Sequence, residues 1–580
     1  MATLQGAMLA SIAELGIQIL LPWLTSPGLK NINQYVAWLS PLAHALILLP
    51  LMALAALIAR RSPTNRDRIL LTVAFCYAAT QTALLQSRVA AAAAIALGLG
   101  LGLALGRLSQ RPWWSTAFRG VAFASRSLVI VWALALPVLW WVFGRPATPT
   151  GAIPPAGSPN VLLLILDTVG AREMSLYGYA RRTTPVIDSI ARHGVTFDRA
   201  VASAPWTLPS HASMFTGVMA SKLSGRFRVP LDDSYPTVAE AFGAEGYATA
   251  GFVANVEYAG RSSGLARGFQ YYEDHVPSLG SAVLTTGIGR LVRRQIHALG
   301  VRPLTPGRKE AGDVNRSFLK WQGRQHDRPW FAFLNYYDAH DPYVPPMGEE
   351  NRFLAEGSKL SFYLEDLHGA SAEQIASARA LHDAALFSLD RAVGTLLAEL
   401  DRRGTLDNTV IVISSDHGEE WGEHGLVSHG NSLYLPVLHV PLVVVREGVV
   451  PSGVRARRTV DLRRLGATLL ALARVPHPEF GESLTLEWTD SGRASTEAGM
   501  GVLSWVEQTR NRPMWYPSAK SELFSVVDDS TQVILGSSVE AYNFVRDPGL
   551  VRDIVGDSMF APKVRYLQSV SAQSRDSARR

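Results

Sequence analysis

The stretch "NVLLLILD", residues 160–167, is a continuous apolar run that ends in an aspartate. Such a run is typical of a strand that is buried on both faces, as the strands of a parallel sheet are. Further stretches of strand length are "YATAGFVAN" (247–255), "FAFLNYYDAH" (331–340), "TVIVISSDHG" (409–418) and "VPLVVV" (440–445). Helical patterns lie between them. This alternation predicts an α/β domain beyond about residue 158.

Ionisable side chains stand where three of these strands end. Asp167 closes the run at 160–167, Asp338 and His340 close the run at 331–340, and Asp416 and His417 follow the third. Ligands of open α/β sheets bind at the carboxyl ends of the strands, so we expect these groups to meet. Two aspartates, a histidine and a hydroxyl suit one divalent ion, with zinc or manganese ahead of calcium or magnesium.

The hydroxyl of that set is expected from "APWTLPSHASMFTG", residues 204–217, where Thr207 stands just before Pro209 and a helical pattern. One interpretation is a helix cap, because threonine accepts hydrogen bonds from the first N–H groups of a helix and proline is tolerated there. The other is a nucleophile, because a metal ion lowers the pKa of a bound hydroxyl and a helix N-terminus favours an anionic group. Thr207 is therefore a candidate catalytic residue and metal ligand as well as a cap.

Apolar segments dominate the first 145 residues. Each of five segments approaches the roughly 20 residues that a membrane-spanning helix needs. They are residues 8–24, 36–59, 69–86, 88–106 and 127–144. The fourth is rich in alanine and glycine, which suits close packing of helices in lipid. We therefore expect an α-helical membrane domain of about five transmembrane helices over residues 1–145.

Arginines gather in two of the loops between these segments. They are Arg60, Arg61, Arg66 and Arg68 in one loop and Arg107, Arg111, Arg119 and Arg126 in the other. Cytoplasmic loops carry an excess of Lys and Arg, so both loops and the N-terminus are expected in the cytoplasm. Everything after residue 145 is then expected outside it, in the periplasm or the extracellular space. This pattern predicts a multi-pass protein of the cell (inner) membrane.

The composition disfavours two other classes of protein. The formal net charge is +6, but no run of Lys and Arg is interleaved with aromatic residues, so no nucleic-acid partner is expected. The one cysteine, Cys76, lies in an apolar run, so the chain can form no internal disulfide and no thiolate metal site.

A segment rich in Pro, Gly and Ala, residues 146–158, should form a semi-stiff linker after the membrane domain. Beyond it we expect a catalytic domain over residues 159–480 and a C-terminal subdomain over residues 481–560. Residues 561–580 are expected to be a tail, of which the last ten look disordered.

The soluble part resembles the sulfatase-like branch of the alkaline phosphatase superfamily over about residues 159–555. The matching pieces are "PNVLLLILDT", "SLYGYARRTTPVIDSIARHGVTFDRAVASAPWTLPSHASMFTG", "NYYDAHDPYVPP", "DNTVIVISSDHGEEWGEHG" and "SHGNSLYLPVLHVPLVV". Several motifs in order are far more specific than any one of them. The resemblance implies an alkaline-phosphatase-like α/β domain. The ending "SSVEAYNFVRDPGLVRDI" is similar to the family's C-terminal strand, which implies a small C-terminal antiparallel sheet.

The resemblance also implies roles for single residues. Asp167, Asp416 and His417 fall on metal-ligand positions of the family. Thr207 falls on the position of the nucleophile, which also contacts the metal.

Four histidines are candidates for binding the substrate. His340, in "HDPY", and His429, in "SHGNSLY", fall where the family contacts the transferred anionic group or holds a second metal. His211 stands where the family's motif has an arginine. His424, in "GEHG", suits a substrate contact and a solvated loop equally.

Departures from the family pattern bear on the chemistry. True sulfatases begin the Cys/Ser-x-Pro-Ser-Arg motif with a residue that is oxidised to formylglycine. Thr207 cannot give that aldehyde and Cys76 lies elsewhere, so no formylglycine is expected. Arg172 stands where many relatives have an aspartate, which favours a single metal site. Glu419 and Glu420 are expected on a solvated face.

We therefore expect a membrane-anchored, metal-dependent phosphotransferase that moves a phospho-head-group through a phosphothreonine intermediate at the cell surface. A threonine nucleophile, spanning helices and an outward-facing domain are also found in the membrane-bound phosphoethanolamine and glycerol-phosphate transferases of this branch. The expected substrate is a membrane lipid or a surface phosphodiester or ester. One alternative is a sulfatase-family hydrolase of phosphate or sulfate esters. The other is a non-catalytic membrane protein that keeps the fold as a binding module, which the filled ligand positions disfavour.

Overall fold

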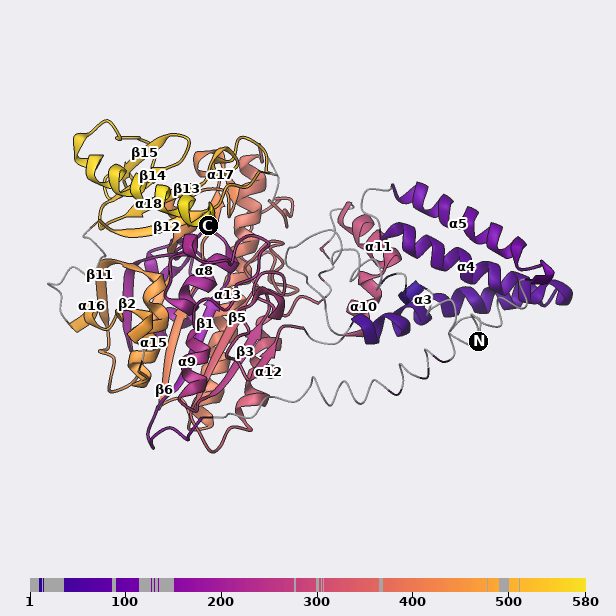
Figure 1. Cartoon of the computed structure of the whole chain (residues 1–580), viewed down its shortest axis with the longest axis horizontal. Coiled ribbons are helices and arrows are strands. Elements are labelled where there is room, and N and C mark those ends of the chain that lie inside the picture. Colours follow the sequence, from indigo (N-terminus) through magenta and orange to yellow (C-terminus); the bar gives the residue numbers. More distant parts are fainter. Residues whose placement is uncertain are drawn as a thin grey trace. The chain divides into compact units, whose positions relative to one another are not determined.

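The computed structural model describes two units of the chain. The described residues are 36–85, 90–113, 151–275, 278–298, 307–364, 369–476, 478–489, 500–510 and 512–579, with single residues in 10–14, 127–134 and 302–305. Contacts assign Met1–Pro146 and His275–Arg308 to one unit, here called the N-terminal unit. Ala147–Asp274 and Lys309–Arg580 form the C-terminal unit. Figure 1 shows both.

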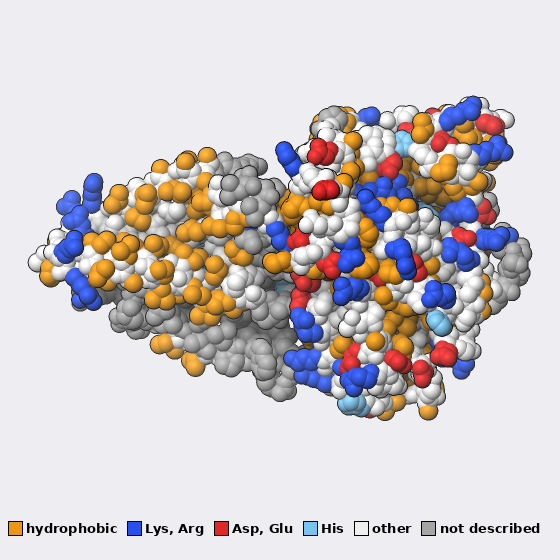
Figure 2. All heavy atoms as spheres, turned by 180° about the vertical axis from the view of Figure 1, so that it is seen from behind, with side chains coloured by type: hydrophobic (Ala, Val, Ile, Leu, Met, Phe, Trp, Pro, Cys, Tyr) orange, Lys and Arg blue, Asp and Glu red, His pale blue; other side chains and the backbone are white. Residues whose placement is uncertain are grey.

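Three long helices of the N-terminal unit match three of the predicted spans. They are α3 (Val36–Ala59), α4 (Arg66–Leu84) and α5 (Ala91–Leu108). Two stretches, Leu39–Ala59 and Ala91–Leu108, are long and apolar enough to cross a membrane. Apolar side chains cover the visible face of these helices, and Lys and Arg side chains gather at one end (Figure 2). The predicted spans 8–24 and 127–144 lie almost wholly outside the described residues.

Glycines on α5 bring its backbone against α4. A Cβ added at Gly98 would lie 2.2 Å from Thr80 Oγ1, and one added at Gly102 would lie 2.4 Å from Cys76 Sγ. Gly106 meets the same helix one turn further on. A stripe of small residues at intervals of four lets two helices approach closely, and this contact is the one that the composition of residues 88–106 predicts.

The C-terminal unit is built on one mixed sheet in the order β11-β2-β10-β6-β1-β5-β3-β4, with β9 beside β2. Its strands are β1 (Asn160–Leu166), β2 (Val195–Val201), β3 (Ala248–Val253), β4 (Tyr271–Glu273), β5 (Trp330–Tyr336), β6 (Thr409–Ser414), β9 (His439–Val440), β10 (Leu442–Val445) and β11 (Val454–Asp461). The central strand β1 pairs in parallel with β5 and β6, whereas β10 and β9 run antiparallel to their neighbours. The predicted α/β domain is confirmed.

Helices cover both faces of this sheet (Figure 1). They are α7 (Pro185–Ala191), α12 (Ala311–Gln322) and α13 (Ala372–Arg402) on one face, and α8 (Thr207–Thr216), α9 (Val238–Ala244) and α15 (Leu465–Ala473) on the other. Leu162, Leu164 and Leu166 of β1 point to the α12–α13 side and lie in its core with Phe318 and Leu389. Because β1 is buried on both faces, its sequence shows no polar alternation.

A small antiparallel sheet follows, as the family resemblance implies. It contains β12 (Val502–Val506), β13 (Leu523–Val527), β14 (Thr531–Leu535) and β15 (Val539–Asn543). The helix α18 (Ala561–Arg579) packs on this sheet through Leu567, which shares a core with Trp505 and Phe524. The disorder expected for the last ten residues is therefore wrong up to Arg579, because they continue a helix whose earlier turns pack on the sheet.

One segment departs from the predicted domain boundaries. Residues 275–308 lie between β4 and α12 in sequence, yet they fold with the N-terminal unit as α10 (Leu279–Thr285) and α11 (Gly287–Ala298). The chain leaves the C-terminal unit after Asp274 and re-enters it at Lys309. These two points are adjacent, because Lys309 Nζ donates to the carbonyl of Glu273 (2.9 Å) and contacts its Oε1 (3.2 Å). The predicted domain over 159–480 thus contains an excursion into the other unit.

Candidate metal and catalytic site

The carboxyl ends of β1 and β6 bring three predicted ligands together. Asp167 follows β1, and Asp416 and His417 follow β6, its neighbour in the sheet. All three side chains are fully buried, and their ligand atoms lie within 4.8 Å of one another. Thr168 has a left-handed φ of 60°, a conformation that is costly for threonine, and its N–H donates to Asp416 Oδ1 (3.2 Å). Backbone and side chains therefore fix the two aspartates against each other.

The hydrogen bonds of these aspartates leave room for a cation. Asp167 Oδ2 accepts from Asn255 Nδ2 (2.9 Å) and Asn335 Nδ2 (3.1 Å), whereas Asp167 Oδ1 and Asp416 Oδ2 have no hydrogen-bond partner among the described residues. Burial, followed by the charge of Asp416, raises the pKa of Asp167 well above its ordinary value. Because two buried carboxylates repel one another unless a positive charge joins them, this set fits a divalent ion.

Thr207 turns its hydroxyl toward this group. It is the first residue of α8, and no side chain makes a capping hydrogen bond at that helix end. Asn255 Nδ2 donates to Thr207 Oγ1 (3.3 Å), and His417 Nε2 lies 3.4 Å from the same oxygen. The Thr207 hydroxyl is thus held by His417, one of the predicted ligands, and by Asn255, which also binds Asp167. These contacts favour the interpretation as a nucleophile over the interpretation as a helix cap.

Two more of the predicted histidines lie beside His417. The ring centroids of His417 and His429 are 4.5 Å apart, and those of His429 and His340 are 5.0 Å apart. Glu419 Oε1 lies 2.9 Å from His429 Nδ1, and Tyr343 donates its hydroxyl to Glu419 Oε2 (3.0 Å). Burial and the neighbouring His417 hold the pKa of His429 well below its ordinary value. The imidazole is neutral near pH 7, with its Nδ1–H directed at Glu419.

The solvated face expected for Glu419 and Glu420 is wrong. Both side chains are fully buried, because Tyr343 covers Glu419 and Ser432 Oγ donates to Glu420 Oε1 (2.7 Å). Consecutive acidic residues after a strand do not indicate an exposed segment when hydroxyl groups from distant parts of the chain donate hydrogen bonds to their carboxylates. Glu419 is therefore a residue of the site that the sequence pattern did not reveal.

Arg172, which stands where many relatives have an aspartate, forms ion pairs with two glutamates. Its Nη1 contacts Glu423 Oε1 (2.6 Å) and its Nε contacts Glu173 Oε1 (2.9 Å). Arg379 also lies 3.6 Å from Glu173. The charge of Glu173 is therefore balanced by two arginines. Glu173 is not one of the three residues whose ligand atoms converge, which are Asp167, Asp416 and His417.

The remaining two candidate histidines, His211 and His424, lie in different surroundings, and their expected substrate contacts stay predictions. His211 is fully buried, with Nδ1 2.8 Å from the carbonyl of Thr207 and 3.5 Å from Asp416 Oδ2, so it contacts the protein beneath the site. His424 stacks on Tyr434 at 3.7 Å, and it has no ring contact with the other site histidines in the described structure.

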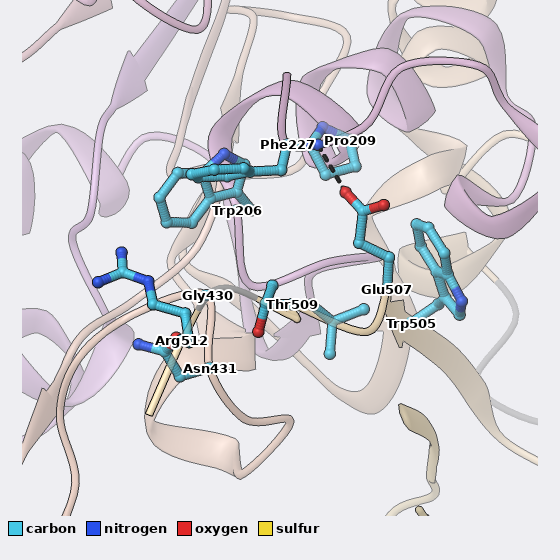
Figure 3. Close-up of a pocket in the computed structure, with 10 residues that line it drawn as sticks. Trp206, Pro209, Phe227, Gly430, Asn431, Trp505, Glu507, Thr509 and Arg512 are labelled. Carbon is cyan, nitrogen blue, oxygen red and sulfur yellow. Dashed lines mark hydrogen bonds between the residues drawn. The ribbon is translucent and has the colours of Figure 1, made fainter. Parts of the chain in front are cut away.

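A pocket opens beside the first turn of α8 (Figure 3). It is lined by Trp206, Pro209, Phe227, Gly430, Asn431, Trp505, Val506, Glu507, Thr509 and Arg512. The Trp206 ring covers Gly430, where an added Cβ would lie 2.2 Å from it. Glu507 Oε1 accepts from the N–H of Phe227 (2.8 Å), which joins the two sides of the pocket. The pocket thus offers aromatic walls and one guanidinium next to the helix turn that begins at Thr207.

Asn255 and Asn335 belong to the site although the sequence analysis did not single them out. Each lies in or just after a predicted strand, at the same sheet edge as Asp167. The sequence could have indicated them, because Asn255 and Asn335 lie within the predicted strands 247–255 and 331–340, and polar side chains near the carboxyl ends of such strands come together.

Comparison with known proteins agrees with this geometry. Residues 159–475 match the sulfatase family. Arylsulfatase K of Bos taurus is 24% identical over 357 residues, a match that covers 56% of this chain but only 64% of the bovine protein. Arylsulfatase A of Homo sapiens is 25% identical over 409 residues, which cover 64% of this chain and 73% of the human protein.

Solved structures show the same fold. The phosphonate monoester hydrolase of Agrobacterium radiobacter superimposes with a TM-score of 0.56 at 19% identity, covering 72% of this chain and 96% of that one. A phosphonate monoester hydrolase from Silicibacter pomeroyi gives a TM-score of 0.53 at 20% identity, with 72% and 94% covered. At this identity the likeness concerns the fold of the C-terminal unit.

Proposed function

Because the chain belongs to the sulfatase family, we propose that it is a metal-dependent enzyme that cleaves phosphate or sulfate esters with Thr207 as the nucleophile. The observation that carries this proposal is the Thr207 hydroxyl, which lies at a helix N-terminus and contacts His417 and Asn255 instead of capping the helix. Asp167, Asp416, His417 and Thr207 would hold the ion. A divalent ion there lowers the pKa of the threonine hydroxyl and offsets the charge that develops on the transferred group.

The chain's own groups then divide the work. The Thr207 oxygen forms a bond to phosphorus or sulfur and loses its proton, while the ester oxygen leaves and takes up a proton. His429, fixed at Nδ1 by Glu419, keeps its Nε2 for the substrate, and His340 stands beside it. His211 supports the Thr207 carbonyl and so positions the nucleophile. The aromatic pocket with Arg512 would take the part of the ester that is not transferred.

The adduct on Thr207 can be resolved in two ways, by water or by an alcohol. Hydrolysis of phosphate or sulfate esters is the activity that the family relationship supports best. Transfer of a phospho-head-group is the second candidate, and threonine itself favours it. Threonine cannot be oxidised to formylglycine, so its adduct would persist until an acceptor arrives. Membrane lipids and surface phosphodiesters are the proposed donors.

The proposed location is the outer side of a membrane. Exposed arginines lie between α3 and α4, in the first turn of α4 and at the end of α5, namely Arg60, Arg61, Arg66, Arg68, Arg107 and Arg111. Under the positive-inside rule this end of the N-terminal unit faces the cytoplasm, and the catalytic unit then lies on the other side.

A Thr207→Ala variant of the full chain tests the nucleophile. We expect turnover of phosphate, phosphonate and sulfate esters to fall by about a thousandfold or more, because no covalent route remains, while bound metal persists. Thr207→Ser should keep partial activity. Mass spectrometry of quenched wild-type enzyme should find the adduct on the peptide containing residues 204–217, and adding an alcohol acceptor should divert product if transfer occurs.

Thr216→Ala is the matched control, since Thr216 ends the same helix and its hydroxyl bonds to local backbone, donating to the carbonyl of Ala212 (2.7 Å) and accepting from the N–H of Val218 (3.2 Å). It should cost about 1 kcal/mol of stability and leave turnover unchanged. An active Thr207→Ala enzyme would refute the nucleophile assignment.

A further inference from the structure

Residues 275–308, which fold with the N-terminal unit, form two helices that have no part in the proposed ester cleavage. Within the N-terminal unit, α10 packs against α3 and α11 against α4 (Figure 1). A segment encoded between two elements of the catalytic sheet therefore contributes two helices to the unit that holds the apolar bundle.

Buried polar groups fix the start of α11 to α4. Gln81 Oε1 accepts from the N–H of Ile288 (3.0 Å), and Gln81 is almost fully buried. The Glu14 carboxylate, itself bonded to His44 Nε2 (2.9 Å), lies close enough to Arg290 to act on its charge. The Ile288 side chain packs on the core of the bundle. These contacts hold the first turn of α11 in place.

This attachment lies at the end of the bundle away from the arginine-rich loop. The helix α4 begins at Arg66, directly after that loop. With a rise of 1.5 Å per residue, Gln81 lies about 22 Å further along the helix. If the arginine-rich loop marks the cytoplasmic side, α11 begins near the outer surface of the membrane.

The sequence of α11, "GIGRLVRRQIHA", separates apolar from cationic residues. At 100° per residue, Ile288, Leu291, Val292 and Ile296 fall on one side, and Arg290, Arg293 and Arg294 fall on the other. Beyond the contact of Ile288 the apolar side continues outward, since Val292 is 44% exposed. Neither Arg293 nor Arg294 has an ion-pair partner among the described residues, and the helix contains no acidic residue.

We propose that α11 lies in the headgroup region of the outer leaflet and binds anionic phospholipids. Its apolar side would enter the acyl chains, and its arginines would bind the phosphate groups, which a guanidinium recognises with two parallel hydrogen bonds. Charge complementarity argues for this occupant, because Arg293 and Arg294, which have no ion-pair partner among the described residues, stand beside apolar side chains and match an anionic bilayer surface. The inference rests on the proposed membrane location and is independent of the chemistry at Thr207.

Spin labels on the full chain in lipid nanodiscs test the depth of α11. In a Cys76→Ala background, Val292→Cys and Arg294→Cys carry the labels on the two sides of the helix. Leu99→Cys, exposed on the span α5, is the lipid reference, and His326→Cys, in an exposed loop of the C-terminal unit, is the aqueous reference. We expect position 292 to match the lipid reference in oxygen accessibility and position 294 to report the headgroup region. A label at 292 that matches the aqueous reference would overturn the proposal.

Charge reversal tests the lipid. Nanodiscs contain phosphatidylcholine with or without phosphatidylglycerol, and native mass spectrometry counts the anionic lipid retained per protein. Arg293→Glu with Arg294→Glu should lower the retained phosphatidylglycerol by about fivefold for each arginine. Arg457→Glu with Arg458→Glu, two neighbouring arginines on β11, are the matched control and should retain it.

Thermal unfolding checks that the reversed variant is folded, and Arg293→Gln with Arg294→Gln replaces it if it is not. Equal retention by the α11 and β11 variants would show that α11 packs on protein alone. None of these measurements requires turnover, so their failure is distinct from a failure of the proposed ester chemistry.

Discussion

Two groups of buried acids stand within a few residues of each other, and they are neutralised in different ways. Asp167 and Asp416 contact no Lys or Arg among the described residues, and their free oxygens converge with His417. Glu173, only six residues beyond Asp167, is equally buried but contacts Arg172 and Arg379. Burying a carboxylate is costly unless a positive partner is present. The arginine-paired group therefore has positive side chains beside its buried acid, whereas the aspartate group has none and fits a divalent ion.

The largest expected effect comes from Asp416→Asn. This change removes one charge from the group that has no internal cation, so bound metal should disappear and turnover should fall at least a thousandfold. Elemental analysis of the purified protein and a rate assay measure both. Glu173→Gln is the control, since it changes an acid of the arginine-paired group and should leave the metal content intact. Full turnover by metal-free protein would contradict the distinction between the two groups.

A smaller effect is expected from Glu419→Gln. Glu419 does not join the aspartate group but holds His429 through Nδ1. Removing the carboxylate charge should leave the metal bound and lower turnover about 10- to 100-fold, the usual range for residues that orient a ligand or catalytic histidine. The metal content and the rate of one preparation separate this outcome from that of Asp416→Asn. Metal loss in Glu419→Gln would move Glu419 into the ligand group.

Arg172→Met changes the arginine-paired group. It leaves Glu423 without its arginine and Glu173 with Arg379 alone. Because Arg172 is 30% exposed, we expect a loss of about 1–3 kcal/mol in the free energy of unfolding and no loss of metal. Denaturant unfolding measures the first and elemental analysis the second. A variant that lost its metal but kept its stability would reverse the assignment of the two groups.

The smallest effect concerns Glu420, a buried acid whose Oε1 accepts from Ser432 Oγ and which forms no ion pair within the part of the chain that the structure describes. Burial raises its pKa well above the ordinary value, so the folded protein favours the protonated form. This contribution to stability is fully present below the unfolded pKa of 4.5 and is lost as the pH rises through the folded pKa. Glu420→Gln should match wild type at low pH and become the more stable protein as the pH rises. Melting curves that stay parallel from pH 5 to 9 would contradict this.

The sequence predicted the parts of the molecule that depend on local pattern. Continuous apolar runs located β1, β5 and β6, and the polar residues at their ends identified Asp167, Asp416 and His417. It missed β2, whose central Asp198 and Arg199 interrupt the run, because the strand is stabilised by pairing with β10 and β11.

Other features depend on partners that are distant in sequence. Glu419 is buried by Tyr343, which is 76 residues away, and no local property of "DHGEEW" encodes that contact. The helix α18 forms over residues expected to be a tail because the C-terminal sheet covers its apolar side. The excursion at residues 275–308 was missed for the same reason, since its partners precede it by some two hundred positions.

The Lys309–Glu273 contact gives that excursion a practical consequence for protein production. A fragment that begins at residue 150 would still contain α10 and α11, whose apolar side chains would have lost the bundle on which they pack, and such a fragment is prone to aggregation. The chain departs and returns at adjacent points, so a few flexible residues could replace 275–308 between Asp274 and Lys309. Such a fragment would keep every strand of the mixed sheet and would remove both helices that pack on the apolar bundle.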